Sequence, residues 1–229
     1  MAEQCSVLGS GAAVRIALFD MDRTLVRVDT ATLYVRYQRA LGEIGVGEHA
    51  RMAWWLLRYT FGVIDAPKVA RQALKSYRGR SEAWMIERCQ GWFGEWVVPH
   101  VAEAGRRAVE RHQRAGDLIA IVTGATTYAA SPLAAMLGIE HVVCTELELD
   151  ERGNFTGELL PPMCYGAGKI ERAGRLAERL GVSLDDATFY TDSITDLPLL
   201  DVVKDRVIVN PDARLARVAR RRGWPIERW

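Results

Sequence analysis

The sequence lacks the features that mark several large classes of protein. Its four cysteines lie far apart and form no C-x-x-C pair, so neither a zinc knuckle nor a disulfide framework is indicated. Lys and Arg together number 30, against 29 for Asp and Glu, so the chain has no basic excess of the kind that general nucleic-acid binding requires. We therefore expect reduced thiols, a cytoplasmic protein and no nucleic-acid partner.

Long apolar runs are also absent. The most apolar stretch, Met52 to Leu57, is followed by Arg58 and is far shorter than the roughly 20 residues that a bilayer span needs. The opening segment MAEQCSVLGSGAAV lacks the basic and apolar regions of a secretory signal. We expect no stable membrane insertion. The oligomeric state stays open, with a homo-oligomer among the alternatives.

The chain does contain short apolar runs that alternate with helical patterns. The runs are Val14–Phe19, Leu118–Val122, Ala187–Tyr190 and Val207–Val209, and they are typical of central parallel strands buried on both faces. After the first run, helical spacing alone continues from about residue 30 to residue 103. We predict a doubly wound parallel α/β sheet with a helical cap inserted after the first strand. Residues 1–27 and 104–229 would form the core, and residues 28–103 the cap.

Polar side chains follow three of these predicted strands, and a lysine begins a helix nearby. The set is Asp20, Asp22, Thr123, Gly124, Lys169, Asp192 and Asp196. In doubly wound sheets the active site lies at the carboxyl ends of the strands. Converging carboxylates suit Mg²⁺ with a substrate phosphate, one carboxylate can attack phosphorus, and a second can serve as acid and then base. The pattern predicts metal-assisted phosphoryl transfer.

Four segments that carry these residues resemble the ordered motifs of the haloacid dehalogenase (HAD) superfamily. They are FDMDRTL at 19–25, VTGA at 122–125, YGAGKIERA around Lys169 and YTDSITDLPLL at 190–200. Their order and the helical block after the first motif resemble the phosphoserine-phosphatase-like subfamily IB, as do the stretches PPMCYGAGK and VNPDARLARVARRRGWPI. The resemblance covers nearly the whole chain, although the cap matches only in position and type. It implies a HAD-like, Rossmannoid core and a Mg²⁺-dependent phosphatase acting on a small phosphate ester.

The resemblance also implies catalytic roles for the matching residues. Asp20 matches the nucleophile, whose side chain also binds the metal. Asp22 matches the general acid and base, and its main-chain carbonyl matches a metal ligand. Thr123 and the Gly124 N–H match the pair that binds phosphate, and Lys169 matches the lysine that neutralises nucleophile and phosphate.

Five further positions complete the expected site. Asp192 matches the remaining protein ligand of the metal, and Asp196 the acid that supports the metal's waters and the lysine. Thr195 stands where phosphoserine phosphatases carry Asn, and Arg23 stands where Gly or Ser is usual. Asp29 stands where phosphoserine phosphatases carry a Glu that receives the substrate ammonium. A helix beginning near Thr30 offers another role for Asp29, since Asp is a favoured N-cap.

Alternatives to hydrolysis remain at this point. The same fold serves phosphotransferases and mutases, which would pass the phosphoryl group to an acceptor. A signalling module phosphorylated on aspartate is a second alternative, although such a module would have no large cap. The predicted cap holds five of the seven tryptophans, namely Trp54, Trp55, Trp84, Trp92 and Trp96. They would form either the core of the cap or an apolar lid over a lipid-like or aromatic substrate.

Overall fold

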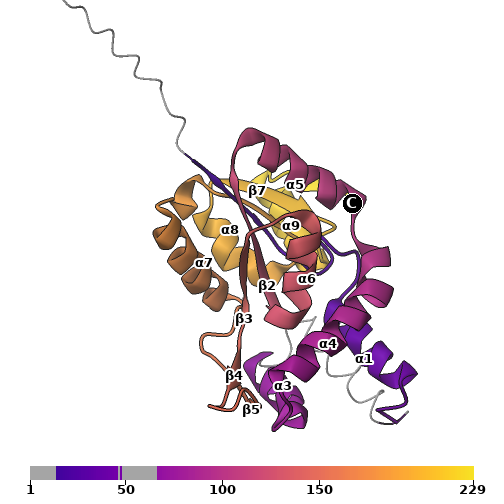
Figure 1. Ribbon diagram of the computed structural model, residues 1–229. Coiled ribbons are helices and arrows are strands. Elements are labelled where there is room, and N and C mark those ends of the chain that lie inside the picture. Colours follow the sequence, from indigo (N-terminus) through magenta and orange to yellow (C-terminus); the bar gives the residue numbers. More distant parts are fainter. Residues whose placement is uncertain (1–13, 46, 48–65) are drawn as a thin grey trace, which may run out of the picture.

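The computed structural model describes residues 14–45, 47 and 66–229, and its centre is a parallel sheet (Figure 1). Six strands lie in the order β3-β2-β1-β6-β7-β8, and every neighbouring pair is parallel. The strands are β1 Ile16–Phe19, β2 Leu118–Thr126, β3 His141–Thr145, β6 Thr188–Thr191, β7 Asp205–Val209 and β8 Ile226–Glu227. Because the chain winds outward from β1 in both directions, the predicted doubly wound α/β sheet is confirmed. The two-residue strand β8 was not predicted.

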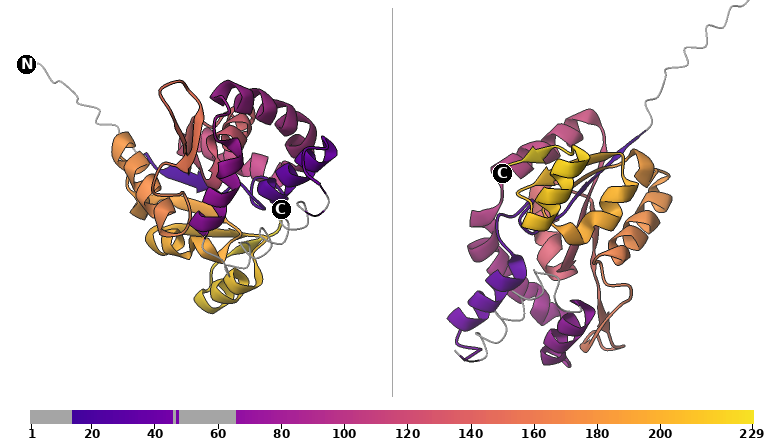
Figure 2. Two further views of the ribbon diagram at one scale, coloured as in Figure 1. Left: turned by 90° about the horizontal axis from the view of Figure 1, so that it is seen from below. Right: turned by 180° about the vertical axis from the view of Figure 1, so that it is seen from behind.

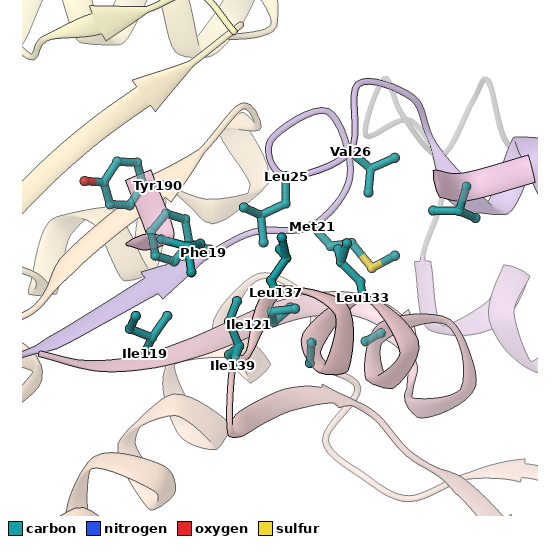
Figure 3. Packing of buried hydrophobic residues seen from close by; sticks show 14 of the residues in the cluster. Phe19, Met21, Leu25, Val26, Ile119, Ile121, Leu133, Leu137, Ile139 and Tyr190 are labelled. Carbon is teal, nitrogen blue, oxygen red and sulfur yellow. The ribbon is translucent and has the colours of Figure 1, made fainter. Parts of the chain in front are cut away.

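Helices cover both faces of this sheet. They are α5 Glu103–Ala115 and α6 Thr127–Leu137 on one face, and α7 Ala167–Leu180, α8 Leu197–Val202 and α9 Ala213–Arg222 on the other. Alternate residues of β1 divide between the two faces: Phe19 packs in the cluster under α5 and α6, and Leu18 in the cluster under α7 to α9. The division arises because successive side chains of a strand point to opposite faces of the sheet. Figure 3 shows the first cluster around Phe19.

Helices inserted after β1 lie at one end of the core (Figures 1 and 2). They are α1 Thr30–Ala40, α3 Ala66–Leu74 and α4 Glu82–Trp92. Residues 146–160 alternate around Glu151-Arg152-Gly153-Asn154, which predicts a hairpin. This hairpin forms as the antiparallel pair β4 Leu147–Leu149 and β5 Phe155–Leu159. It bonds to the inserted segment through Gly79 N to Phe155 O and Glu82 N to Gly153 O. The cap is therefore hydrogen-bonded to a hairpin from the second half of the chain. The helical spacing of residues 49–61, which include Trp54 and Trp55, predicts a further helix, and this segment lies outside the described residues.

The helix that begins after Ser81 differs from its prediction. The helical spacing after Ser81 predicts a helix that runs to about Val98 and stops at Pro99. Instead α4 ends at Trp92 and a π-helical turn continues to Val97. Pro99 lies inside the short 3-10 turn that follows, where its missing N–H is tolerated because a first turn leaves that group unpaired. Other 3-10 turns are Lys75–Tyr77, Leu184–Asp186 and Ile194–Asp196. Over the described ranges, no helix combines the length and apolar character that crossing a bilayer requires.

Candidate active site

The loop after β1 holds the first two aspartates at the carboxyl edge of the sheet. Phe19 pairs with Ile121 of β2 and with Tyr190 of β6, and the next amide, Asp20 N, donates to Tyr190 O at 2.9 Å. The loop then turns tightly, with Val26 N donating to Met21 O at 2.9 Å. Met21 and Val26 are fully buried in the cluster of Figure 3. This packing fixes the loop, so the aspartates within it have a defined position.

A buried lysine joins two of the expected residues. Lys169 Nζ lies 2.7 Å from Asp20 Oδ1 and 2.8 Å from Asp196 Oδ2. Lys169 is 4% exposed and Asp196 is 1% exposed. Burial opposes the charge on Lys169, but the two carboxylates outweigh it and raise the pKa of the ammonium group. The lysine therefore stays charged, as neutralisation of a phosphate requires.

Three aspartates of the candidate site, Asp20, Asp22 and Asp192, have raised pKa values. Burial raises the pKa of Asp20 to about 6, although the Lys169 charge opposes the rise. Burial and the Asp29 carboxylate raise the pKa of Asp22 to about 7. Burial, Asp20 and Asp196 raise the pKa of Asp192 well above its usual range. Carboxylates that raise one another's pKa values in a cleft are typical of a functional site, and a cation between them would relieve their repulsion.

The strand β2 brings in the expected phosphate-binding pair. We predicted that this strand would end at Val122, but it continues to Thr126 with a shift of register against β3 between these two residues. The shift takes Thr123 and Gly124 out of regular pairing. Thr123 is fully buried, and its Oγ1 accepts from Ala125 N at 3.1 Å. The hydroxyl hydrogen of Thr123 therefore remains for donation to another group.

All of the predicted site residues line one cavity of about 90 Å³. The described residues around it include all ten candidates, namely Asp20, Asp22, Arg23, Asp29, Thr123, Gly124, Lys169, Asp192, Thr195 and Asp196. Arg23 has a positive φ of 56°, a conformation that glycine adopts more easily. Its guanidinium lowers the pKa of Asp192, against the larger effect of burial. Thr195 Oγ1 lies 2.9 Å from Ser193 Oγ.

Asp29 caps a helix and also lines the cavity. Its Oδ1 accepts from Thr32 N at 2.7 Å, which makes it the N-cap of α1. Asp22 Oδ1 accepts from Thr30 N at 2.8 Å at the same helix end. Arg27 is a nearby cation in the sequence that could have paired with Asp29, but its guanidinium donates to Pro99 O at 3.1 Å. The cap bond uses only Oδ1, and Asp29 also lines the cavity, so its Oδ2 is available to a ligand.

A larger cavity of about 280 Å³ opens from the first under the cap. Both cavities share Asp22, Asp29 and Gly124. The larger one extends between α1, α3, α4 and α6, and its described lining is mostly apolar. Such a concave, apolar space with a few polar groups is typical of a small-molecule site.

Two carboxylates and one carbonyl fit a divalent cation here. The described residues contain no group of three or more His, Cys, Asp or Glu side chains arranged to hold a metal. The expected set needs only two such side chains, Asp20 and Asp192, with the Asp22 carbonyl, because Mg²⁺ keeps several waters and shares the substrate phosphate. Asp196 Oδ1 is buried without a hydrogen-bond partner in the described part of the chain, which leaves it free to receive a water of such a cation.

Comparison with known families agrees with this geometry. The family model of haloacid dehalogenase-like hydrolases matches residues 17–201, which includes every candidate residue. The chain belongs to the haloacid dehalogenase-like hydrolase family. The predicted superfamily, its phosphoserine-phosphatase-like group and the enzyme class are therefore confirmed.

Three similar proteins extend over nearly the whole HAD-like chain. A histidinol-phosphatase from Neisseria meningitidis serogroup C is 31% identical over 216 residues, covering 92% of this chain and 97% of that protein. Phosphoserine phosphatase SerB1 of Mycobacterium tuberculosis is 32% identical over 222 residues, covering 92% of this chain and 69% of that protein. A solved protein of unknown function from Bordetella pertussis Tohama I superposes with a TM-score of 0.84 at 27% identity, covering 93% of this chain and 98% of that one.

Two residues that hold the site in place, Thr191 and Asp212, were not among the residues expected from the sequence. Thr191, the last residue of β6, donates from Oγ1 to Asp196 Oδ2 at 2.6 Å and so fixes the Asp196 side chain. Asp196 occupies the N-cap position of α8, but its side chain makes no cap bond to that helix and bonds instead to Lys169 and Thr191. Asp212 Oδ2 accepts from Ile194 N at 2.8 Å while its Oδ1 caps α9. The Pro211-Asp212 pair before α9 is a sequence signal from which the cap role of Asp212 could have been predicted.

Proposed function

We propose that this HAD-like hydrolase is a Mg²⁺-dependent phosphomonoesterase that cleaves a small phosphate ester through an aspartyl phosphate on Asp20. One observation carries the proposal. Asp20 lies 2.7 Å from the Lys169 ammonium, in the same small cavity as Asp22, whose pKa is about 7. The lysine favours the ionised form of Asp20, which can attack phosphorus, while Asp22 retains a proton that it can donate near neutral pH.

The reaction then proceeds in two displacements. An Asp20 oxygen bonds to phosphorus as the bond to the ester oxygen breaks, and Asp22 gives its proton to the departing alkoxide. The Asp22 carboxylate next takes a proton from a water whose oxygen bonds to phosphorus, and the bond to Asp20 breaks. Lys169, the Thr123 hydroxyl and the Gly124 N–H hold the phosphate oxygens during both steps. Phosphate is released and Asp20 is restored.

Asp20, Asp192 and the Asp22 carbonyl are the residues that would hold Mg²⁺. When bound, the cation neutralises charge on the phosphate and orients it for in-line attack. The raised pKa values of Asp20 and Asp192 support this assignment. Burial is the main cause of both rises, and the Asp20 charge adds to the rise at Asp192, so a cation beside the two carboxylates would favour their ionised forms. Residues 1–27 and 104–229 would form the catalytic core, and residues 28–103 the cap that closes over it.

The alcohol part of the substrate carries an amine near the phosphate in this proposal. Asp29 supplies a carboxylate that lines both cavities and that raises the pKa of Asp22. A substrate ammonium between Asp29 and the phosphate would remove two repulsions at once. The histidinol-phosphatase and the phosphoserine phosphatase among the relatives are named for phosphate esters of amino alcohols, which supports the same class.

Phosphate release from a small panel of esters tests the proposal. We expect Mg²⁺-dependent release that Asp20→Asn abolishes, since an amide is a poor nucleophile. Amine-bearing phosphates should be preferred over neutral phosphates of equal size, and Asp29→Asn should reduce that preference by about 1.5–3 kcal/mol. An added acceptor alcohol that captures the phosphoryl group in place of water would indicate a phosphotransferase. Full activity in Asp20→Asn would contradict the mechanism.

A further inference from the structure

The larger cavity under the cap has a mostly apolar wall. Alanine, leucine, methionine and aromatic side chains make up most of its described lining, among them Leu74, Met85 and Leu147. The charged side chains of that lining are Asp22 and Asp29, and both also border the smaller cavity. The charge therefore lies where the two cavities meet, and the remainder of the larger cavity offers an apolar surface.

The polar atoms of the large side chains in this wall are engaged within the protein or buried. Tyr34 Oη accepts from Arg88 Nε at 2.8 Å, and Tyr77 Oη accepts from Gln38 Nε2 at 3.4 Å. The two tyrosine hydroxyls also bond to each other. Gln38 Oε1 and Trp92 Nε1 are buried away from the accessible surface, so they offer no hydrogen bond to a ligand. Because a polar ligand group loses its water here without gaining a partner, the wall favours an apolar ligand.

The apolar space is continuous with the phosphate site. The two cavities share Asp22, Asp29 and Gly124. In the proposed reaction Asp22 gives its proton to the departing alkoxide, and the Gly124 N–H holds a phosphate oxygen. An ester whose phosphate lies beside Asp20 would therefore extend its alcohol part into the larger cavity. The occupant of this cavity is the substrate itself.

The volume of the cavity limits the size of the group that it can hold. A protein cavity of about 150 Å³ holds benzene, so a volume of about 280 Å³ holds on the order of ten carbon atoms. The rings of Tyr34 and Trp92 meet edge-on with their centroids 5.3 Å apart, which fixes the wall on this side by packing. The cavity is therefore a bounded apolar site.

We propose that the substrate is a phosphate ester whose alcohol carries, beyond the amine, an apolar group of up to about ten carbon atoms and no carboxylate. The apolar group displaces water from the larger cavity, and each methylene that it buries favours binding. Asp29 at the entrance attracts the amine and repels a carboxylate. The inference rests on the proposed function, because the phosphate of the same molecule occupies the site beside Asp20. It distinguishes such an ester from phosphoserine, which has a carboxylate where the apolar group would be.

A matched series of esters tests the apolar group. Phosphoethanolamine and its derivatives with alkyl groups of increasing length on the amine-bearing carbon share the phosphate and the amine. We expect kcat/KM to rise by about threefold for each added methylene and to level off once the alkyl group exceeds about ten carbon atoms. Valinol phosphate and phosphoserine differ in an isopropyl group against a carboxylate of similar size. Valinol phosphate should be favoured by about tenfold or more, because contact between like charges opposes binding.

A variant that fills the cavity tests its place in recognition. Ala129 of α6 lines the cavity, so Ala129→Leu should lower kcat/KM for the long-chain esters by about tenfold or more. The loss on phosphoethanolamine should be much smaller, and the levelling-off should move to shorter chains. Ala135→Leu is the matched control, since Ala135 is an exposed residue of the same helix outside the described cavity lining, and it should leave the series unchanged. If Ala129→Leu does not fold, Ala73→Leu makes the same test, because Ala73 is exposed on α3 and also lines the cavity.

Binding of phosphonates, which cannot be hydrolysed, separates the two proposals. With Mg²⁺ present, calorimetry should show that 2-aminooctylphosphonate binds more tightly than 2-aminoethylphosphonate by about 100-fold or more, with a more negative heat-capacity change. Binding and turnover that do not depend on chain length, or a preference for phosphoserine over valinol phosphate, would overturn the apolar-substrate inference while leaving a working phosphatase. Binding that strengthens with chain length, without phosphate release from any ester, would support the apolar site and contradict the proposed function.

Discussion

Gly168 offers a test of how the fold positions Lys169, to which we assign a catalytic role. It precedes Lys169 in the first turn of α7, and a Cβ added at Gly168 would lie 2.0 Å from the carbonyl oxygen of Met163. Ordinary contacts begin near 3.4 Å, so Gly168→Ala must separate the two main-chain segments by more than 1 Å. Neither segment can relieve the clash by a side-chain rotation, because the atom that is met belongs to the backbone. The displacement therefore reaches Lys169 and its contacts with Asp20 and Asp196.

The expected losses can be stated for both stability and rate. Overpacking of this kind costs about 1–3 kcal/mol of unfolding free energy, and a misplacement on the order of 1 Å at a catalytic group costs about 100-fold in kcat. Gly174→Ala in the same helix is the matched control, since a Cβ there meets nothing within 4 Å. That control should stabilise the protein by about 0.5–1 kcal/mol with unchanged kcat. Urea unfolding and steady-state phosphate release measure both quantities, and wild-type activity in Gly168→Ala would refute the reasoning.

Three other experiments test the remaining roles. Asp22→Asn should lower kcat on an alkyl phosphate by about 10²–10⁴-fold but affect p-nitrophenyl phosphate much less, because p-nitrophenolate departs without a proton; equal losses on both esters would exclude the acid role. Asp192→Ala should raise the Mg²⁺ concentration for half-maximal activity by about tenfold or more, and an unchanged Mg²⁺ titration would exclude it as a ligand. The raised pKa of Asp22 means that the folded state holds a proton that the unfolded chain releases, so the stability of the metal-free protein should fall as the pH rises from 3.8 to about 7. Thermal unfolding of Asp22→Asn over that range should show a smaller fall, and an identical fall would assign the proton to another group.

The core and the residues of the candidate site could be predicted because their signals are local in sequence. Helix ends at Gly116, Gly138 and Gly181 have the left-handed conformation that glycine favours, and Ser81 caps α4 through its own hydroxyl. Strand ends followed by aspartate or threonine identify the functional edge because every parallel strand ends on the same side. The order of the motifs then assigns a role to each residue without knowledge of distances.

The larger cavity under the cap could not be predicted in the same way. Gln38 and Trp92 lie far apart in sequence, and only the packing of α1 against α4 and the π-helical turn brings them to one wall. The hairpin beneath the cap bonds to residues more than 70 positions earlier, which no local pattern signals. Likewise, the close approach of Gly168 to Met163 depends on the turn that starts α7. The sequence alone therefore does not show why glycine is required at position 168.

Chemical trapping of the phosphoryl group tests the central claim most directly. The protein is mixed with a radiolabelled phosphate ester and Mg²⁺, quenched in acid within one turnover, digested and sequenced by mass spectrometry. The account predicts one phosphoryl group per trapped chain on Asp20, with Asp22→Asn altering its accumulation and Asp20→Asn abolishing it. Hydrolysis at the normal rate with the phosphoryl group on another residue, or with no covalent species at any quench time, would contradict it.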